Sequence, residues 1–328
     1  MKNKYRNIFL AFGIVAVLIM IFTFDMDYQE LWANLKRAGV YLPLVLLLWL
    51  FVYLINTTSW YIIIRSGGKP GFSFARLYKF TVTGFALNYV TPVGLMGGEP
   101  YRIMELKPYI GVERATSSVI LYVMMHIFSH FCFWLSSVLL YLCLYPVGWV
   151  MGTILGTITV FCLLVAMLFV KGYQHGMAVA FVRLGSHLPF LKKKVIRFAD
   201  SHREQLENID KQIALLHQQK KGAFYAALFL EYTARVVSCL EIWLILNVLT
   251  RSVSFADCCL IAAFSSLLAN LLFFLPMQLG GREGGFALAV GGLSLSEAYG
   301  VYAALITRVR EMVWIVIGLA LMKVGNKK

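Results

Sequence analysis

The stretch Thr91-Pro-Val-Gly-Leu-Met-Gly-Gly-Glu-Pro-Tyr-Arg102 interrupts an apolar run that begins at Leu77. Proline removes a backbone donor and glycine adds backbone freedom, so a helix through this stretch should break. Non-helical backbone at membrane depth is tolerated only where it is buried in protein or lines a wet cavity. Two charges, Glu99 and Arg102, follow the break directly, and charges are costly in hydrocarbon. The pattern predicts a broken, re-entrant membrane segment that ends at a polar site.

A second stretch, residues 276–285, has the same design and also follows an apolar run. In both stretches a Gly-Gly pair precedes a glutamate seven residues after a proline, Glu99 after Pro92 and Glu283 after Pro276. Paired Gly/Pro-interrupted segments in the two halves of a membrane protein indicate a transporter binding site. The alternative is a pair of exposed loops, because loops also collect glycine, proline and charge.

Composition places the chain among membrane proteins. Of its 328 residues, 60% are hydrophobic and 14% are charged. Several runs exceed the ~18 apolar residues that span a bilayer, so we expect an all-α polytopic membrane protein. The formal net charge of +14 lies mostly in a few loops and suits contact with anionic headgroups on the cytoplasmic face. No soluble basic domain is large enough for nucleic-acid binding, and we expect no metal and no cofactor.

The distribution of lysine and arginine predicts the topology. The expected full spans lie at about residues 8–24, 40–64, 117–144, 150–170, 223–249 and 298–322. Basic residues flank the first broken segment on both sides, so it should enter and leave from the cytoplasm. The second broken segment, about 255–292, should dip in from the outer face, which keeps both termini cytoplasmic. The prediction is one domain over residues 1–328 in the inner membrane, with six spans and two re-entrant segments in an inverted-repeat-like arrangement.

Residues 172–222 are the only long polar stretch. Apolar residues recur in it at steps of three and four, which predicts an amphipathic helix. It is also basic, with Lys192, Lys193 and Lys194 in a row. We expect this cytoplasmic loop to contact anionic inner-leaflet lipid at these lysines, or to pack on another helix.

Charged residues also fall within the last two expected spans. Glu231 and Arg235 are one helical turn apart and can share a face, and Arg308 and Glu311 are three residues apart. An ionisable residue inside a membrane is a functional hypothesis by default. The alternative is a structural pair that holds helices together. Arg235 and Arg308 are the expected contacts for an anionic headgroup.

Two enzyme-like patterns are incomplete. His126 and His130 are one turn apart, but no glutamate stands beside His126 as the zinc-protease motif requires. Polar packing is therefore the better interpretation of this pair. The stretch Gly67-Gly-Lys-Pro70 lacks the first glycine and the final Ser or Thr of a nucleotide-binding loop. No ATP site is predicted.

The sequence resembles the transmembrane region of lysylphosphatidylglycerol synthases, the multiple peptide resistance factor family, and its stand-alone flippase-like relatives. The resemblance covers nearly the whole chain. It rests on Pro92-x-Gly94-x-x-Gly97-Gly98-Glu99-x-x-Arg102 and on Pro276 through Gly280-Gly281-Arg282-Glu283-Gly284. It implies a membrane region that moves lipid, whereas full-length members also carry a cytosolic domain that aminoacylates phosphatidylglycerol. Since the chain stops at Lys328, we expect no synthase half, and a lysyl-lipid substrate does not follow.

The candidate site residues fall into two groups. Those expected to bind substrate are charged: Glu99, Arg102, Arg282, Glu283, Glu231, Arg235 and Arg308. Those expected to break or hinge the backbone are Pro92, Gly94, Gly97, Gly98, Pro276, Gly280, Gly281 and Gly284. If the two re-entrant tips meet near the midplane, both motif glutamates and both motif arginines share one cavity.

Two hypotheses of function follow. The first is a flippase or scramblase for an anionic or lipid-linked headgroup. The second is a membrane enzyme, or its accessory subunit, that acts on lipid-linked substrates and uses Glu99 and Glu283 for acid–base or metal chemistry. A small-solute or ion transporter would share the architecture but would not need so basic an inner face. Each hypothesis is compatible with a homo-oligomer.

Overall fold

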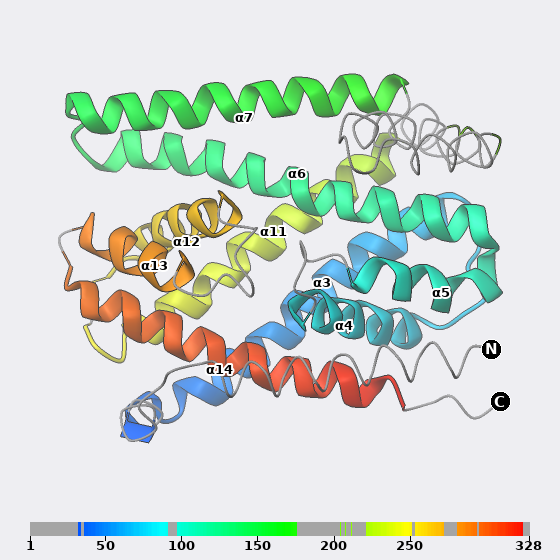
Figure 1. Ribbon diagram of the computed structural model, residues 1–328, viewed down its shortest axis with the longest axis horizontal. Helices are drawn as coiled ribbons and strands as arrows, with labels where there is room; N and C mark the ends of the chain where they lie inside the picture. The colour runs from blue at the N-terminus through cyan, green and yellow to red at the C-terminus, as the bar shows by residue number, and fades with distance from the viewer. Residues whose placement is uncertain are drawn as a thin grey trace, which may run out of the picture.

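The computed structural model describes residues 36–90, 97–175, 221–250, 253–271, 281–293 and 295–323, with residues 32, 33, 204, 207 and 211. This part of the chain consists of α-helices and the turns between them, without a strand (Figure 1). The predicted all-α class is therefore confirmed. The expected first span, residues 8–24, and most of the basic loop, including Lys192, Lys193 and Lys194, lie outside the described residues.

Three helices are long and apolar enough to cross a membrane by length and composition. They are α3 (Tyr41–Ser66), α6 (Val112–Leu144) and α7 (Trp149–His175, apolar to Phe169). With 33 residues, α6 is about 50 Å long at ~1.5 Å per residue. Because the hydrocarbon core is only about 30 Å thick, α6 must tilt or extend beyond it. Much of the α7 surface is apolar and exposed, which fits a helix that faces lipid.

Two further helices have spanning length but carry charge. They are α11 (Lys221–Leu246) and α14 (Glu297–Leu321), at the places predicted for the last two spans. Five of their charged side chains point inward, since Glu231, Glu241, Arg308, Arg310 and Glu311 are all buried. Inward placement is expected because charge in a membrane must pair within the protein or face a wet cavity.

Each predicted broken segment is a pair of short helices. The pairs are α4 (Phe74–Val90) with α5 (Gly98–Ile110), and α12 (Phe255–Leu271) with α13 (Gly281–Gly291). The 17 residues of α4 and 13 of α5 correspond to about 26 and 20 Å, less than the ~30 Å core. The breaks at 91–96 and 272–280 lie outside the described residues, and with them Pro92, Gly94, Pro276 and Gly280.

The α4–α5 pair is a hairpin whose outer ends meet. Arg76 in the first turn of α4 donates from Nη1 to the hydroxyl of Tyr109 near the end of α5, at 2.9 Å. Arg114 at the start of α6 donates from Nη2 to the carbonyl of Ile64 at the end of α3, at 2.8 Å, and also to the carbonyl of Gly68. The helices before and after the hairpin therefore end at the same side of the molecule. The α12–α13 hairpin lies at the opposite side (Figure 1).

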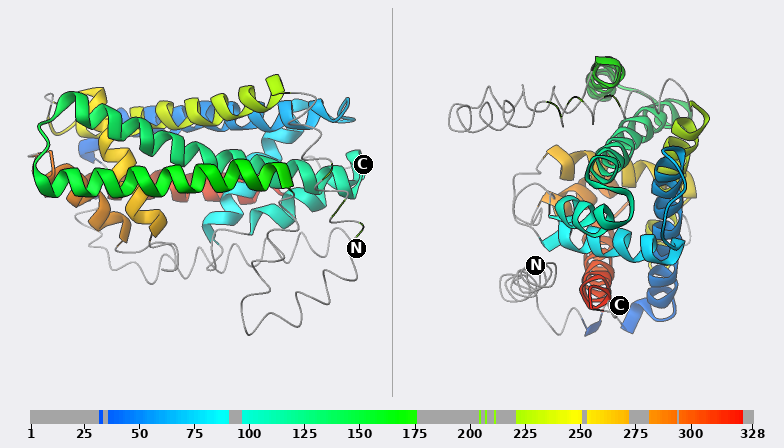
Figure 2. Two further views of the ribbon diagram at one scale, coloured as in Figure 1. Left: turned by 90° about the horizontal axis from the view of Figure 1, so that it is seen from above. Right: turned by 90° about the vertical axis from the view of Figure 1, so that its right-hand side faces the viewer.

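The described helices repeat one pattern twice. In α3–α4–α5–α6 the helices have 26, 17, 13 and 33 residues, and in α11–α12–α13–α14 they have 26, 17, 11 and 25. Contacts correspond as well, because α4 packs on α14 as α12 packs on α6. The central helices α3 and α11 are antiparallel, and the two sets run in opposite directions (Figure 1). Outside this arrangement, α7 packs on α6 (Figure 2).

Glycine allows the short helices to approach their neighbours closely. A Cβ on Gly98 would lie 2.1 Å from the carbonyl oxygen of Gly84, so α5 can pack on α4 only without a side chain there. A Cβ on Gly300 would lie 2.5 Å from the carbonyl oxygen of Phe286, which is the equivalent constraint between α14 and α13. Small residues at such contacts are typical of membrane helices.

The other predicted hinge glycines have different surroundings. Gly97 stands before α5 with an ordinary helical φ of −76°. Gly281 is the first residue of α13. Gly284 has open space where a Cβ would be. Of the predicted hinge glycines that the structure describes, Gly98 is the one that helix packing requires, because a side chain there would collide with α4.

A capping box begins α12. Asp257 accepts hydrogen bonds from the backbone N–H and hydroxyl of Ser254, at 3.0 and 2.7 Å, and its own N–H donates to Ser254 Oγ at 3.1 Å. Tyr145, in the turn between α6 and α7, donates its hydroxyl proton to Asp257 Oδ1 at 2.6 Å. This hydrogen bond, with burial, raises the pKa of Tyr145 to about 12. The start of the second hairpin is thereby joined to the α6–α7 turn.

Replacing Gly98 by Ala should destabilise the protein by about 1–3 kcal/mol, because the added methyl group forces α5 away from α4. The matched control is Gly156→Ala on α7, where the new Cβ would enter open space and should leave stability unchanged or raise it slightly. Thermal unfolding in detergent measures both. Equal unfolding midpoints for the two variants would contradict the packing described.

Candidate functional site

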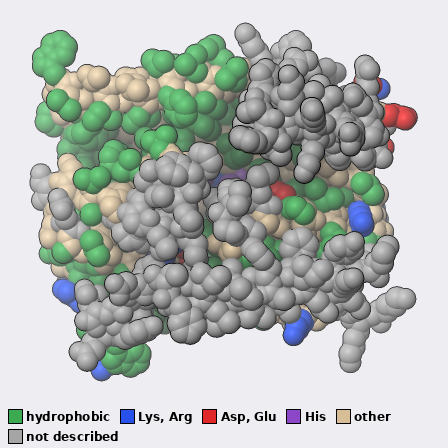
Figure 3. Space-filling model, in the orientation of Figure 1, with side chains coloured by type: hydrophobic (Ala, Val, Ile, Leu, Met, Phe, Trp, Pro, Cys, Tyr) green, Lys and Arg blue, Asp and Glu red, His purple; other side chains and the backbone are tan. Residues whose placement is uncertain are grey.

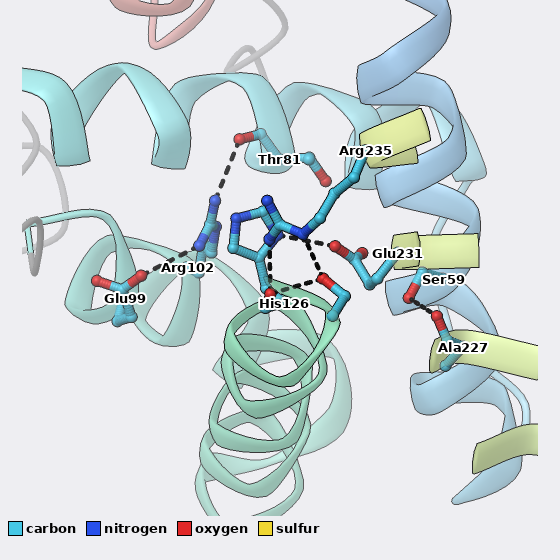
Figure 4. A network of polar contacts seen from close by, with 9 residues as sticks. Ser59, Thr81, Glu99, Arg102, His126, Ala227, Glu231 and Arg235 are labelled. Atoms are coloured by element: carbon cyan, nitrogen blue, oxygen red, sulfur yellow. Dashed lines mark hydrogen bonds and ion pairs between the residues drawn. The ribbon is translucent and has the colours of Figure 1, made fainter. Parts of the chain in front are cut away.

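A polar network lies inside the protein where α4, α5, α6 and α11 converge (Figure 4). It includes four residues that the sequence analysis selects as substrate contacts: Glu99, Arg102, Glu231 and Arg235. Two come from the first hairpin and two from α11, which is more than 120 residues away in sequence. The fold thus brings the first motif beside the charges of α11.

Arg102 is the central cation of the network. Its side chain is only 1% exposed, and Nη1 lies 3.3 Å from Glu99 Oε1. Three aromatic rings from three helices surround the guanidinium, which stacks favourably on such rings. The rings are Phe85 of α4 at 4.8 Å, Tyr122 of α6 at 5.4 Å and Trp60 of α3 at 5.8 Å from Cζ. Nη2 also donates to the carbonyl of Thr81 at 3.4 Å, so Arg102 is held in place by packing, one carboxylate and one backbone carbonyl.

Glu99 is fixed by the end of the preceding helix. Asn88 on α4 donates from Nδ2 to Glu99 Oε1 at 2.9 Å, and Asn88 Oδ1 accepts the Gly98 N–H at 2.6 Å. An acidic side chain in the first turn of α5 is also favoured by the helix dipole. The Glu99 side chain is 20% exposed. Asn88 thus orients both the start of α5 and its carboxylate.

The α11 residues of the network contact α6. Glu231 Oε2 lies 2.8 Å from His126 Nδ1, with Glu231 fully buried and His126 31% exposed. Arg235 donates from Nε to Ser129 Oγ and from Nη2 to the carbonyl of His126, both at 2.6 Å. Glu231 and Arg235 share a face as predicted, but their hydrogen bonds join α11 to α6.

Several buried polar atoms of this network lack a hydrogen-bond partner among the described residues. They are Arg102 Nε, Glu99 Oε2, Glu231 Oε1, His130 Nδ1, Tyr122 Oη and Trp60 Nε1. Leaving one such group unpaired costs about 1–3 kcal/mol, so the cluster is suited to a polar ligand or water. Histidine and acidic side chains are visible near the middle of one molecular face (Figure 3). The network therefore has unused polar atoms, and its Glu99 and His126 side chains are 20% and 31% exposed.

A second network joins α3, α11 and α14. Both oxygens of its carboxylate, Glu241, are hydrogen-bonded, whereas Arg310 Nη1 has no hydrogen-bond partner among the described residues and lies 3.7 Å from Glu311 Oε1. Arg310 donates from Nε and Nη2 to both oxygens of Glu241, at 2.9 and 3.1 Å. Trp49 Nε1 donates to Glu241 Oε2 at 2.8 Å, and its ring centre lies 3.8 Å from Arg310 Cζ. Bidentate pairs of this kind are strong and geometrically specific. This network has the features of a structural clamp at the centre of the molecule.

The remaining predicted contacts lie elsewhere. Arg308 is buried near the second network, with Nη1 3.9 Å from Glu311 Oε2. Arg282 and Glu283 belong to the first turn of α13, but their side chains lie outside the described residues. A cavity shared by the two motifs therefore stays a prediction. Among the described residues no group of His, Cys, Asp and Glu is suited to a metal ion.

Several members of the network are not predicted by a sequence motif. His126 is interpreted from the sequence as polar packing because the zinc-protease motif is incomplete, and the structure adds its partner, Glu231 of α11. Asn88, Tyr122 and Trp60 carry no motif at all. Arg310 and Glu241 could be recognised as intramembrane charges, but their pairing spans 69 residues and appears only in three dimensions.

Long apolar helices around buried charge define a multi-pass membrane protein with a polar interior. Residues 8–319 match the model of the lysylphosphatidylglycerol synthase transmembrane region, and the chain belongs to this family. The resemblance inferred from the two Pro/Gly/Glu motifs is confirmed. Neither a curated protein nor a solved structure gives a significant match.

The two buried glutamates of α11 should respond differently to substitution by Gln. Glu241→Gln removes the charge that Arg310 needs and should cost about 3–5 kcal/mol, as expected when a buried ion pair is broken. Glu231→Gln keeps a hydrogen bond to His126 and should lower stability much less. Thermal unfolding in detergent compares them. Equal losses of stability would show that the two networks are equally structural.

Proposed function

We propose that this protein moves a phospholipid or lipid-linked substrate across the cytoplasmic membrane. The headgroup passes through the polar network around Arg102 and Arg235, while the acyl chains remain in the bilayer. The observation that carries this proposal is a buried guanidinium, Arg102, near the partly buried Arg235 and among polar atoms that lack a hydrogen-bond partner within the described residues. Membership in the lysylphosphatidylglycerol synthase transmembrane family supports a lipid as the substrate.

The architecture supports transport through alternating access. We assign six full spans, including residues 8–24, and two re-entrant hairpins, α4–α5 and α12–α13. Transporters with inverted repeats bind substrate near the midplane, at helices that are broken there. Here α5 begins at Gly98, one residue before Glu99, so its N-terminal dipole lies beside the network. This places partial positive charge where an anionic headgroup would enter.

Basic residues at one end of the molecule support an orientation. The end that carries the α4–α5 hairpin has exposed basic residues: Arg65, Lys69, Arg76, Lys107 and Lys221. The positive-inside rule places this end in the cytoplasm. Lys323, just after α14, lies at the same end (Figure 1). We place both termini there, with Lys192, Lys193 and Lys194 against anionic inner-leaflet lipid.

The chemistry of the network suits a phosphate group. Guanidinium binds phosphate through two parallel N–H donors. Arg102 Nε has no hydrogen-bond partner among the described residues, and neither do the Tyr122 hydroxyl and the Trp60 N–H, which belong to two of the rings around the guanidinium. A phosphate oxygen could therefore gain hydrogen bonds without first breaking any at these atoms. Glu99 competes for Arg102 and would exchange with the phosphate as the headgroup enters and leaves.

Liposomes with the purified protein and fluorescent phosphatidylglycerol test the proposal. Wild-type protein should translocate the lipid. Glu99→Gln and Arg102→Lys should each slow translocation at least tenfold, because they remove the exchanging carboxylate and the bidentate donor. Arg76→Ala, an exposed arginine on the same hairpin, is the control and should keep the wild-type rate.

Unfolding midpoints on the same preparations separate function from stability. Midpoints near wild type with lost translocation support the proposal. Unchanged translocation in both Glu99→Gln and Arg102→Lys would contradict it. Conversion of the lipid to a new chemical species without translocation would favour the membrane-enzyme hypothesis instead.

A further inference from the structure

The contact between His126 and Glu231 can bind a proton, and phosphate binding at Arg102 does not require this contact. The Glu231 carboxylate is fully buried, and its described hydrogen-bond partner is the His126 imidazole at 2.8 Å. The second oxygen, Oε1, has no hydrogen-bond partner among the described residues. A carboxylate bound to an imidazole can hold one proton in the shared contact and accept another. The His126 side chain is 31% exposed, so the contact is not enclosed completely by the described residues.

Charged groups face His126 from two neighbouring helices. Arg235 of α11 donates to the His126 carbonyl. From α5, Arg102 interacts electrostatically with His126, and both Arg102 and Glu99 interact electrostatically with Tyr122. On α6 itself, Tyr122 and His130 are the titratable neighbours, with ring centres 6.4 and 5.7 Å from that of His126. The other helices against this part of α6 contribute aromatic rings: Phe85 of α4, Trp60 of α3 and Phe169 of α7.

The formal charges of this network cancel before any ligand enters. Arg102 and Arg235 are balanced by Glu99 and Glu231 when the histidines are neutral. A phosphodiester then adds one uncompensated negative charge to a desolvated site, which is strongly unfavourable. One proton taken up by the His126–Glu231 pair restores neutrality. The anion and the proton therefore favour one another's binding.

We infer that the His126–Glu231 contact is a proton site, and that an anionic phosphodiester headgroup binds together with one proton taken from solution. This inference rests on the proposed function, because it concerns the same polar network. The proton is held at the His126–Glu231 contact while the phosphate lies near Arg102. When the headgroup leaves, the proton leaves too. Lipid movement is thus co-transport with a proton and needs no nucleotide.

The coupling has a measurable thermodynamic consequence. Because linkage is reciprocal, phosphate binding raises proton affinity by the same factor by which the proton raises phosphate affinity. The sign follows from proton uptake on binding, so affinity for the anion falls as pH rises. For one coupled proton, the dissociation constant approaches a tenfold increase per pH unit above the titration of the free pair.

Calorimetry on the purified protein in detergent tests this directly. The probe is dihexanoyl phosphatidylglycerol, titrated at one pH in PIPES and in Tris, whose heats of ionisation differ. The difference in heat gives the number of protons taken up per lipid bound. Above the titration of the free pair, wild-type protein should take up close to one proton per lipid bound, and the dissociation constant should increase by nearly tenfold per pH unit.

Two variants isolate the proton site. His126→Gln and Glu231→Gln should each bring proton uptake close to zero and flatten the pH dependence of binding. Glu113→Gln, an exposed carboxylate at the start of α6, is the matched control and should behave as wild type. If His126→Gln fails to fold, Glu231→Gln carries the comparison, because it keeps a hydrogen-bonding group of the same shape.

A transport measurement separates this inference from the function on which it rests. In liposomes, a pH gradient across wild-type protein should concentrate fluorescent phosphatidylglycerol in the leaflet facing the alkaline side. Translocation that ignores the gradient, or binding without proton uptake, would overturn the inference and leave the translocase intact. Absence of both binding and translocation would overturn both.

Discussion

Hydrocarbon cannot hydrate charge, and this constraint organises the protein. The long helices α11 and α14 would be unstable in a bilayer unless their charged faces met partners inside the protein. The antiparallel contact of α3 with α11 provides the axis for this pairing. Ser59 of α3 donates to the carbonyl of Ala227 at one end, and Trp49 donates to Glu241 at the other. Around that axis the two halves place their charges inward.

The two interior networks solve the same electrostatic problem in different ways. At Arg310 and Glu241 the hydrogen bonds are bidentate and the tryptophan ring covers the cation, so little is gained by admitting a ligand. At Arg102 the guanidinium is held mainly by aromatic rings and one partly exposed carboxylate. The first arrangement stabilises the contact between the halves, whereas the second leaves donors for a substrate. This contrast is the structural basis for assigning transport to one network and support to the other.

Local chemistry in the sequence predicts the elements of this fold but not their pairing. The Pro/Gly stretch predicts that the apolar run is interrupted, and the structure has two separate helices, α4 ending at Val90 and α5 beginning at Gly98. Pro92 lies outside the described residues. The helices at 41–66, 112–144 and 297–321 follow from apolar run length. The prediction that Glu99, Arg102, Glu231 and Arg235 matter is consistent with their convergence in one network. His126 is different, since its role depends on α11 packing against α6, and no local pattern encodes that contact.

We propose above all that the unpaired polar atoms around Arg102 bind the phosphate of a lipid headgroup. A cryo-electron microscopy map of the protein in nanodiscs that contain phosphatidylglycerol tests it most directly. The account predicts headgroup density within about 3.2 Å of Arg102 Nε and of the Tyr122 hydroxyl, the range of a hydrogen bond. A map in which these atoms bond only to other protein groups or to water, with lipid present, would contradict it.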